Sequence, residues 1–171
     1  MVARPEYLSF RRKFEPAITK LVIVAESPPA SGKYFYNPAG TVGEPLFAAF
    51  MLQLGIVPTS TEAGLLAFQQ RGWILIDATY EPVNALNKRE RAGVINRDYP
   101  LLRDDLAAIL PNRSIPIILV KANICRLLAP KLLEDGFNVL NNGCVVYFPS
   151  TGNQKEFHRQ FTAILKGPQA G

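Results

Sequence analysis

Acidic, aromatic and hydroxyl side chains follow three apolar segments of this 171-residue chain. Glu26 comes directly after the apolar run 21–25 and precedes two prolines and the aromatic run 34–36. Asp77 follows the run 73–76, and residues 148–153, FPSTGN, precede a segment with helical spacing. A carboxylate in such a place can position or activate water, and neighbouring aromatic rings offer faces on which a base can stack. These residue types predict one site built from the ends of three segments.

The pair Gly32-Lys33 raises a second possibility, a phosphate-binding loop of the form G-x-x-x-x-G-K-[ST]. In such a loop the glycines let backbone N–H groups close around phosphate, and the final hydroxyl binds magnesium. Here Ser27 stands in place of the first glycine and Tyr34 in place of the hydroxyl residue. Two prolines also remove N–H donors from the loop. We therefore exclude a nucleotide-binding loop of this kind.

The apolar patterns predict an α/β fold. Strand length and β-branched composition indicate strands at residues 21–25, 73–76, 115–120 and 144–147. Helical spacing indicates helices at 45–54, 62–70, 99–110, 122–134 and 153–166, with a bend or break at Pro130. Strands that alternate with helices and are apolar on both faces predict a three-layer α/β/α sandwich with a central, mostly parallel four-stranded sheet. Its binding crevice should lie beyond the carboxyl ends of the strands.

Length and composition indicate one domain that spans residues 1–171, with its core at about 20–166. A chain of 171 residues with 48% hydrophobic content buries enough apolar surface to fold without metals or disulfides. Cys125 and Cys144 are too few for an iron–sulfur cluster or a four-cysteine zinc site. No segment approaches the roughly 18 apolar residues of a membrane span. We expect a cytoplasmic protein that binds neither metal nor membrane. No feature of the sequence requires an oligomer, so we expect a monomer.

The basic balance of the chain fits a polyanionic partner. Nineteen Lys and Arg residues against fourteen Asp and Glu residues leave a formal charge of +5. Several basic residues fall in the polar segment 80–98, which we expect to be a long loop. Such residues supply the salt-dependent, sequence-independent part of nucleic-acid binding. An ordinary solubilising role for this charge remains the alternative.

Taken in this order, the three elements resemble the motifs of the uracil-DNA glycosylase superfamily, over about residues 20–165. Residues 25–29, AESPP, are similar to the first motif, with Glu26 at its acidic position and Pro28 at its shared proline. Residues 32–35, GKYF, are similar to the Gly-Arg-x-Phe that follows this motif in one branch. Asp77 stands where the superfamily usually places the Asn that reads uracil. Residues 148–153 are similar to the second motif.

The resemblance implies an enzyme that flips uracil, or a related deaminated base, out of DNA and hydrolyses its N-glycosidic bond without a cofactor. Glu26 would orient water at C1′ or stabilise the sugar cation, Asp77 would read the base edge, and Phe35 would stack on the base. The residues expected around the base are Phe35, Tyr36, Asp77, Tyr80 and Phe148. The residues expected to contact DNA are Pro28, Lys33, Lys88, Arg89, Arg91, Ser150, Thr151, Gly152, Asn153 and Lys155.

The chain departs from the superfamily at two of these positions. Phe148 replaces a His, Asn or Met, so the imidazole that hydrogen-bonds uracil O2 in several families is absent. Asp77 replaces Asn, which removes the amide that donates to O4 while an acceptor for N3–H remains. We consider Tyr80 and Tyr147 as donors in their place, and expect His158 to face solvent or pack against a helix.

Two alternatives stay open. One is a protein of the same fold that binds DNA or a damaged base without cutting it. The other is a nucleotide or small-molecule α/β enzyme that uses Glu26 and Asp77 as an acid and base pair.

Overall fold

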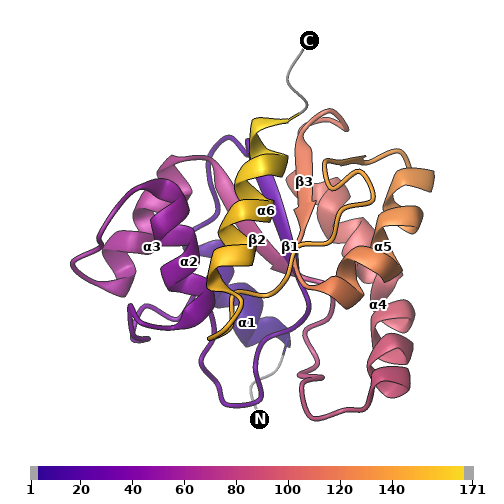
Figure 1. The fold of residues 1–171 in the computed structure, drawn as a ribbon, viewed down its shortest axis with the longest axis horizontal. Coiled ribbons are helices and arrows are strands. Elements are labelled where there is room, and N and C mark those ends of the chain that lie inside the picture. Colours follow the sequence, from indigo (N-terminus) through magenta and orange to yellow (C-terminus); the bar gives the residue numbers. More distant parts are fainter. Residues whose placement is uncertain (1–3, 168–171) are drawn as a thin grey trace.

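A parallel four-stranded sheet forms the centre of the molecule, as seen in a computed structural model that describes residues 4–167. The strands are ordered β2-β1-β3-β4 and comprise β1 (Leu21–Ala25), β2 (Trp73–Asp77), β3 (Pro116–Leu119) and β4 (Asn138–Val139). The helices around them are α1 (Arg4–Arg12), α2 (Pro45–Leu54), α3 (Thr61–Gln70), α4 (Lys88–Ile109), α5 (Ala122–Glu134) and α6 (Gln154–Lys166) (Figure 1). The predicted α/β class and three-layer arrangement are confirmed, and the sheet is parallel throughout.

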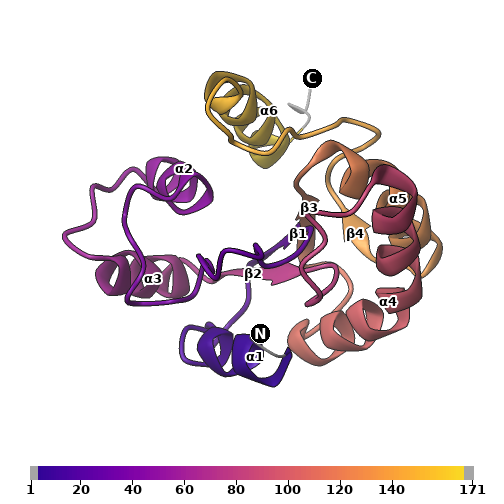
Figure 2. The ribbon, with the colours of Figure 1, turned by 90° about the horizontal axis from the view of Figure 1, so that it is seen from below.

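The sheet is covered on both faces, which explains why its strands are apolar without alternation. Ile23 and Leu75 point into a cluster built largely from α2, α3 and α6. Val24 and Ile76 point into a second cluster with α4 and α5. Figure 2 shows α2 and α6 on one side of the sheet and α1 and α4 on the other. Because every residue of β1 is buried, this strand fixes the position of whatever follows it.

The register of β1 and β2 brings the two candidate carboxyl groups to one edge. The strands pair in parallel from Leu21 opposite Trp73 to Ala25 opposite Asp77. Glu26 therefore follows β1 at the level where β2 ends. The backbone pairing continues for two more residues, since Thr79 N–H donates to the carbonyl of Glu26 at 3.1 Å.

The predicted loop over residues 80–98 is wrong in its second half, because α4 begins at Lys88. Asn87 caps the helix by accepting from Glu90 N–H, and the Glu90 carboxylate accepts from Asn87 N–H in return. In the first two turns only Ile95 is buried, so the apolar periodicity that indicates a helix is absent there. Pro100 lies inside this helix.

The strand expected at residues 144–147 is also wrong. Residues 144–150 have no regular secondary structure, and the fourth strand is β4. The side chain of Asn141 lies beside β3: it accepts from Leu119 N–H at 2.8 Å and donates to the Leu119 carbonyl at 3.0 Å. At this point the backbone N–H and carbonyl of β3 are therefore hydrogen-bonded by a side chain, where pairing with the backbone of another strand was expected. Val146 is nevertheless buried, as its apolar character requires.

Two helices differ from expectation. The polar segment of α1 was not predicted to be helical, and Tyr7 and Arg11 are its buried residues. Helix α5 continues through Pro130 without a break, because Leu128 and Leu132 on either side are buried against α4. No helix among residues 4–167 is long and apolar enough to cross a membrane.

Candidate functional site

A cavity of about 780 Å³ opens at the carboxyl ends of β1 and β2. Its walls come from the segment after β1, the start of α2, the end of β2 and the segment before α6. The cavity brings the three sequence elements together although they lie far apart in the chain. Predicted site residues that line it are Glu26, Pro28, Lys33, Phe35, Asp77, Phe148 and Ser150.

Glu26 is a buried carboxylate surrounded by cationic and amide groups. Its Oε1 lies 2.5 Å from Lys121 Nζ, and its Oε2 accepts from Asn123 Nδ2 at 2.5 Å. Arg91 Nε lies 3.7 Å from the same Oε2. Because both oxygens are engaged and two cations lie close by, the Glu26 side chain is held in one position.

Lys121 and Asn123 were not identified from the sequence. They follow β3, so the third strand end contributes to the site as the first two do. Lys121 has a left-handed backbone, with φ of 87°. This conformation costs a non-glycine residue about 1–3 kcal/mol and persists only where surrounding contacts fix it. The position of a lysine directly after an apolar strand was the signal available.

Asp77 has the opposite surroundings. It is only 4% exposed, and its Oδ2 has no hydrogen-bond partner among residues 4–167. Burial raises the pKa of Asp77 to about 8; Arg11 opposes this rise, and Glu26 and Asp105 add to it. A carboxyl group with this pKa is mainly protonated at neutral pH.

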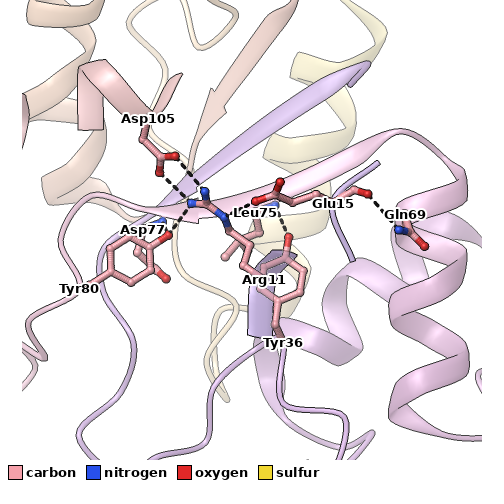
Figure 3. A network of polar contacts seen from close by, with 8 residues as sticks. All are labelled: Arg11, Glu15, Tyr36, Gln69, Leu75, Asp77, Tyr80 and Asp105. Carbon is pink, nitrogen blue, oxygen red and sulfur yellow. Dashed lines mark hydrogen bonds and ion pairs between the residues drawn. The ribbon is translucent and has the colours of Figure 1, made fainter. Parts of the chain in front are cut away.

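Arg11 of α1 is the cation that lowers the pKa of Asp77, but its N–H groups bind other residues (Figure 3). Its guanidinium donates to both carboxylate oxygens of Asp105, at 2.7 and 2.8 Å, and to the Tyr80 hydroxyl at 2.8 Å. Its Nε donates to Glu15 at 3.1 Å. The contacts of Arg11 among residues 4–167 include no hydrogen bond or ion pair with Asp77, so the arginine leaves that carboxyl group unpaired.

Tyr36 and Tyr80 do not line the cavity. Tyr36 is fully buried and its hydroxyl accepts from Leu75 N–H at 2.7 Å, so the structure does not place it against a base in the cavity. Tyr80 is 6% exposed, and its hydroxyl accepts from Arg11 and, at 3.4 Å, from Asp77 N–H. Tyr80 therefore contacts Arg11 and the backbone of Asp77 and is not part of the cavity lining. Tyr147 is 41% exposed and is also outside the lining.

Aromatic rings form two parts of the cavity wall. Phe35 makes edge contacts with Phe50 and Phe68 and lines the cavity. Phe148, which is partly exposed, lies on the wall contributed by the segment before α6. A flat ligand in the cavity would therefore meet rings that belong to two separate segments.

The remaining predicted DNA contacts are distributed around the cavity. Lys33 is 66% exposed and lies 3.6 Å from Glu44. Ser150 lines the cavity, and its hydroxyl accepts from Asn153 Nδ2 at 3.3 Å. The exposed residues beyond the lining are Lys88, Arg89, Thr151, Gly152, Asn153 and Lys155. Arg91 is not part of the cavity lining, and its Nε lies 3.7 Å from Glu26 Oε2.

His158 packs between helices, as expected. Its Nδ1 lies 2.9 Å from Gln53 Nε2 of α2, and burial lowers its pKa. Among residues 4–167, no group of three or more His, Cys, Asp or Glu side chains is arranged to hold a metal ion. Cys125 is buried and Cys144 is exposed, and both are free.

No model of a known protein family matches the sequence, and no curated protein matches it. The resemblance to uracil-DNA glycosylases therefore depends on the motif residues alone.

Proposed function

We propose that this protein is a DNA glycosylase that hydrolyses the N-glycosidic bond of uracil, or of a related deaminated base, held in the cavity. The observation that carries the proposal is the meeting of Glu26, Asp77 and Phe35 in one cavity at the carboxyl ends of two parallel strands. Two carboxyl groups with contrasting surroundings, one bound by a cation and an amide and one buried with an unpaired oxygen, are typical of sites for acid–base and charge-stabilising chemistry.

The chemistry of the proposed reaction assigns a role to each group. Taking a base out of the DNA stack costs a few kcal/mol, which ring contacts with Phe35 and Phe148 would offset. As the bond to the base breaks, its electron pair moves to the base nitrogen and positive charge develops at C1′. The fixed negative charge of Glu26 stabilises that cation, and water adds to C1′. The proton lost by the water neutralises the departing base.

Basic and hydroxyl groups around the cavity fit a DNA backbone. Lys33 and Ser150 line the cavity, and α6 begins four residues after Ser150, so the N-terminal end of this helix directly follows a cavity-lining segment. Lys88, Arg89 and Lys155 are exposed and would add salt-dependent attraction to phosphates. The proposal includes action as a monomer in the cytoplasm.

The direct test is release of uracil from a labelled oligonucleotide, single-stranded and in U·G and U·A duplexes, scored by alkaline cleavage at the abasic site. Glu26→Gln removes the anion and should lower the cleavage rate at least about 100-fold. Glu81→Gln is the matched control, because Glu81 is a half-exposed carboxylate paired with Arg97. Parent cleavage equal to that of Glu26→Gln would contradict the proposal.

One observation favours a second candidate, a protein that binds a damaged base in DNA without excising it. Both oxygens of Glu26 are occupied by Lys121 and Asn123, which leaves this carboxylate poorly placed to take a proton from water. Tight binding of uracil-containing DNA by the parent, with no abasic product, would select this candidate. Indifference to DNA together with binding of free nucleotides would instead select a small-molecule enzyme.

A further inference from the structure

We propose that Asp77 binds the base as a neutral carboxylic acid, donating a hydrogen bond from one oxygen and accepting one with the other. The ligand it suits has a hydrogen-bond donor beside an acceptor on its edge, as uracil has at N3–H and O4. This inference deepens the proposed function and rests on it. It also accounts for an Asp at a position where the resemblance leads one to expect an amide.

The position of Asp77 is that of a binding group. It ends β2, it lines the cavity, and it is 4% exposed. Its Oδ2 is buried without a hydrogen-bond partner among residues 4–167. An unpaired buried polar atom carries a free-energy cost, which a ligand recovers by pairing with it. Because Asp77 lines the cavity, a ligand held there is the group available to pair with it.

Burial is the main cause that favours the neutral form of Asp77; Arg11 opposes it, and two carboxylates add to it. From α1, Arg11 is bound by Asp105, Tyr80 and Glu15. Glu26 directly after β1 and Asp105 in α4 each raise the pKa of Asp77 further, although burial is the larger cause.

The remaining titratable neighbours are phenols, and burial raises the pKa of each of them. They are Tyr7, Tyr34, Tyr36 and Tyr80. Asp77 thus faces neutral phenols, two carboxylates and one guanidinium whose donors are used. The pKa of about 8 agrees with this arrangement.

The protonation state decides what Asp77 can bind. A carboxylate only accepts hydrogen bonds, whereas a carboxylic acid donates one and accepts others. Uracil can donate from N3–H to the acid and accept at O4 from its O–H. With a carboxylate, O4 would instead face an oxygen that has only lone pairs, and the two would repel. Guanine, with adjacent N–H and NH₂ donors, suits the carboxylate. Because the proton can lie on either oxygen, the acid accepts a donor–acceptor edge of either polarity.

The test is the affinity of free uracil for the parent, Asp77→Asn and Asp77→Leu, measured by calorimetry from pH 6 to pH 9. Asn keeps one donor and one acceptor at every pH, and both proteins meet the same ionisation of uracil. The ratio of parent to Asn affinity should be constant up to about pH 7 and fall towards tenfold per pH unit above pH 8. Asp77→Leu should bind uracil at least about tenfold more weakly than the parent at pH 6.

The protonated group can also be observed directly. The infrared difference spectrum of the parent minus Asp77→Asn should contain the carbonyl band of a protonated carboxyl group at pH 6.5 and lose it at pH 9.5. Asp77→Ser provides the same subtraction if the Asn variant does not fold. A carboxylate band alone at pH 6.5, an affinity ratio that is flat from pH 6 to pH 9, or no uracil binding by the parent would each overturn the inference.

The same proteins separate this inference from the proposed function. A falling affinity ratio without base release from DNA would support the role of Asp77 and overturn the glycosylase. Base release with a flat affinity ratio would support the glycosylase and overturn the role of Asp77.

Discussion

Asp77 is the last residue of β2 and Glu26 directly follows β1, at the same edge of the sheet, yet the surroundings of the two carboxyl groups differ. On the Glu26 side, Lys121 and Asn123 bind both carboxylate oxygens. On the Asp77 side, the available cation, Arg11, is bound by Asp105, and one carboxyl oxygen has no partner among the described residues. Strand position brings each carboxyl group to the cavity, and the surrounding side chains determine which hydrogen bonds and ion pairs it makes.

The largest expected effect comes from releasing Arg11. Asp105→Ala leaves a guanidinium that is 4% exposed without its main counterion, so the free energy of unfolding should fall by about 3–5 kcal/mol. The freed Arg11 could then turn to Asp77 and ionise it, which would remove the difference between the two sides. Urea denaturation measures the loss, with Asp104→Ala, an exposed neighbour, as the control.

A loss in Asp105→Ala no greater than that in Asp104→Ala would show that Arg11 finds an equivalent partner. The double variant Arg11→Met with Asp105→Leu should recover much of the stability, because it removes both charges together.

The second expected effect is a pH dependence of stability that belongs to Asp77. Its pKa is about 8 in the folded protein and about 3.9 in an unfolded chain, so the folded state binds more protons between these values. Stability must then fall as pH rises through this window, by up to about 1.4 kcal/mol per pH unit. Asp77→Asn lacks this titration, so its stability relative to the parent should increase by about 2–3 kcal/mol from pH 5 to pH 7.

Urea unfolding of both proteins at pH 5, 6 and 7 provides this comparison, in which other titrating groups cancel. A constant difference between the two proteins would mean that Asp77 is ionised when folded.

The smallest expected effect is on the Glu26 side. Lys121→Ala removes the closest cation, but Lys121 is 30% exposed and Arg91 remains 3.7 Å from Glu26, so stability should fall by only about 1–2 kcal/mol. The left-handed backbone at residue 121 is unfavourable for Ala as it is for Lys, so it contributes little to the difference. Thermal unfolding should show the loss, and Lys166→Ala, on the exposed last turn of α6, should show none.

The backbone of the site could be predicted from the sequence, and its polar partners could not. Apolar runs before Glu26 and Asp77 identified two parallel strands, and parallel strands end at one edge of a sheet. The pairing of Arg11 with Asp105 joins residues 94 positions apart, and nothing local marks one as the partner of the other. The same holds for Glu26 and Lys121, which are 95 positions apart.

The errors in secondary structure have similar causes. Residues 144–147 have a strand composition, but a local pattern cannot show that the Asn141 side chain occupies the neighbouring strand edge. For α4, the capping pair of Asn87 and Glu90 is visible in the sequence and could have placed the start of the helix at Lys88.

Helix α1 has a consequence for how the protein can be shortened. It lies outside the sheet and precedes every strand, so it looks dispensable for a minimal domain. Yet it supplies Tyr7 to the core and Arg11 to the network behind Asp77. A chain that starts at residue 16 would admit water behind Asp77 and leave Asp105 unpaired. Such a fragment would keep its sheet, but the carboxyl group of Asp77 would revert to that of an ordinary, ionised aspartate.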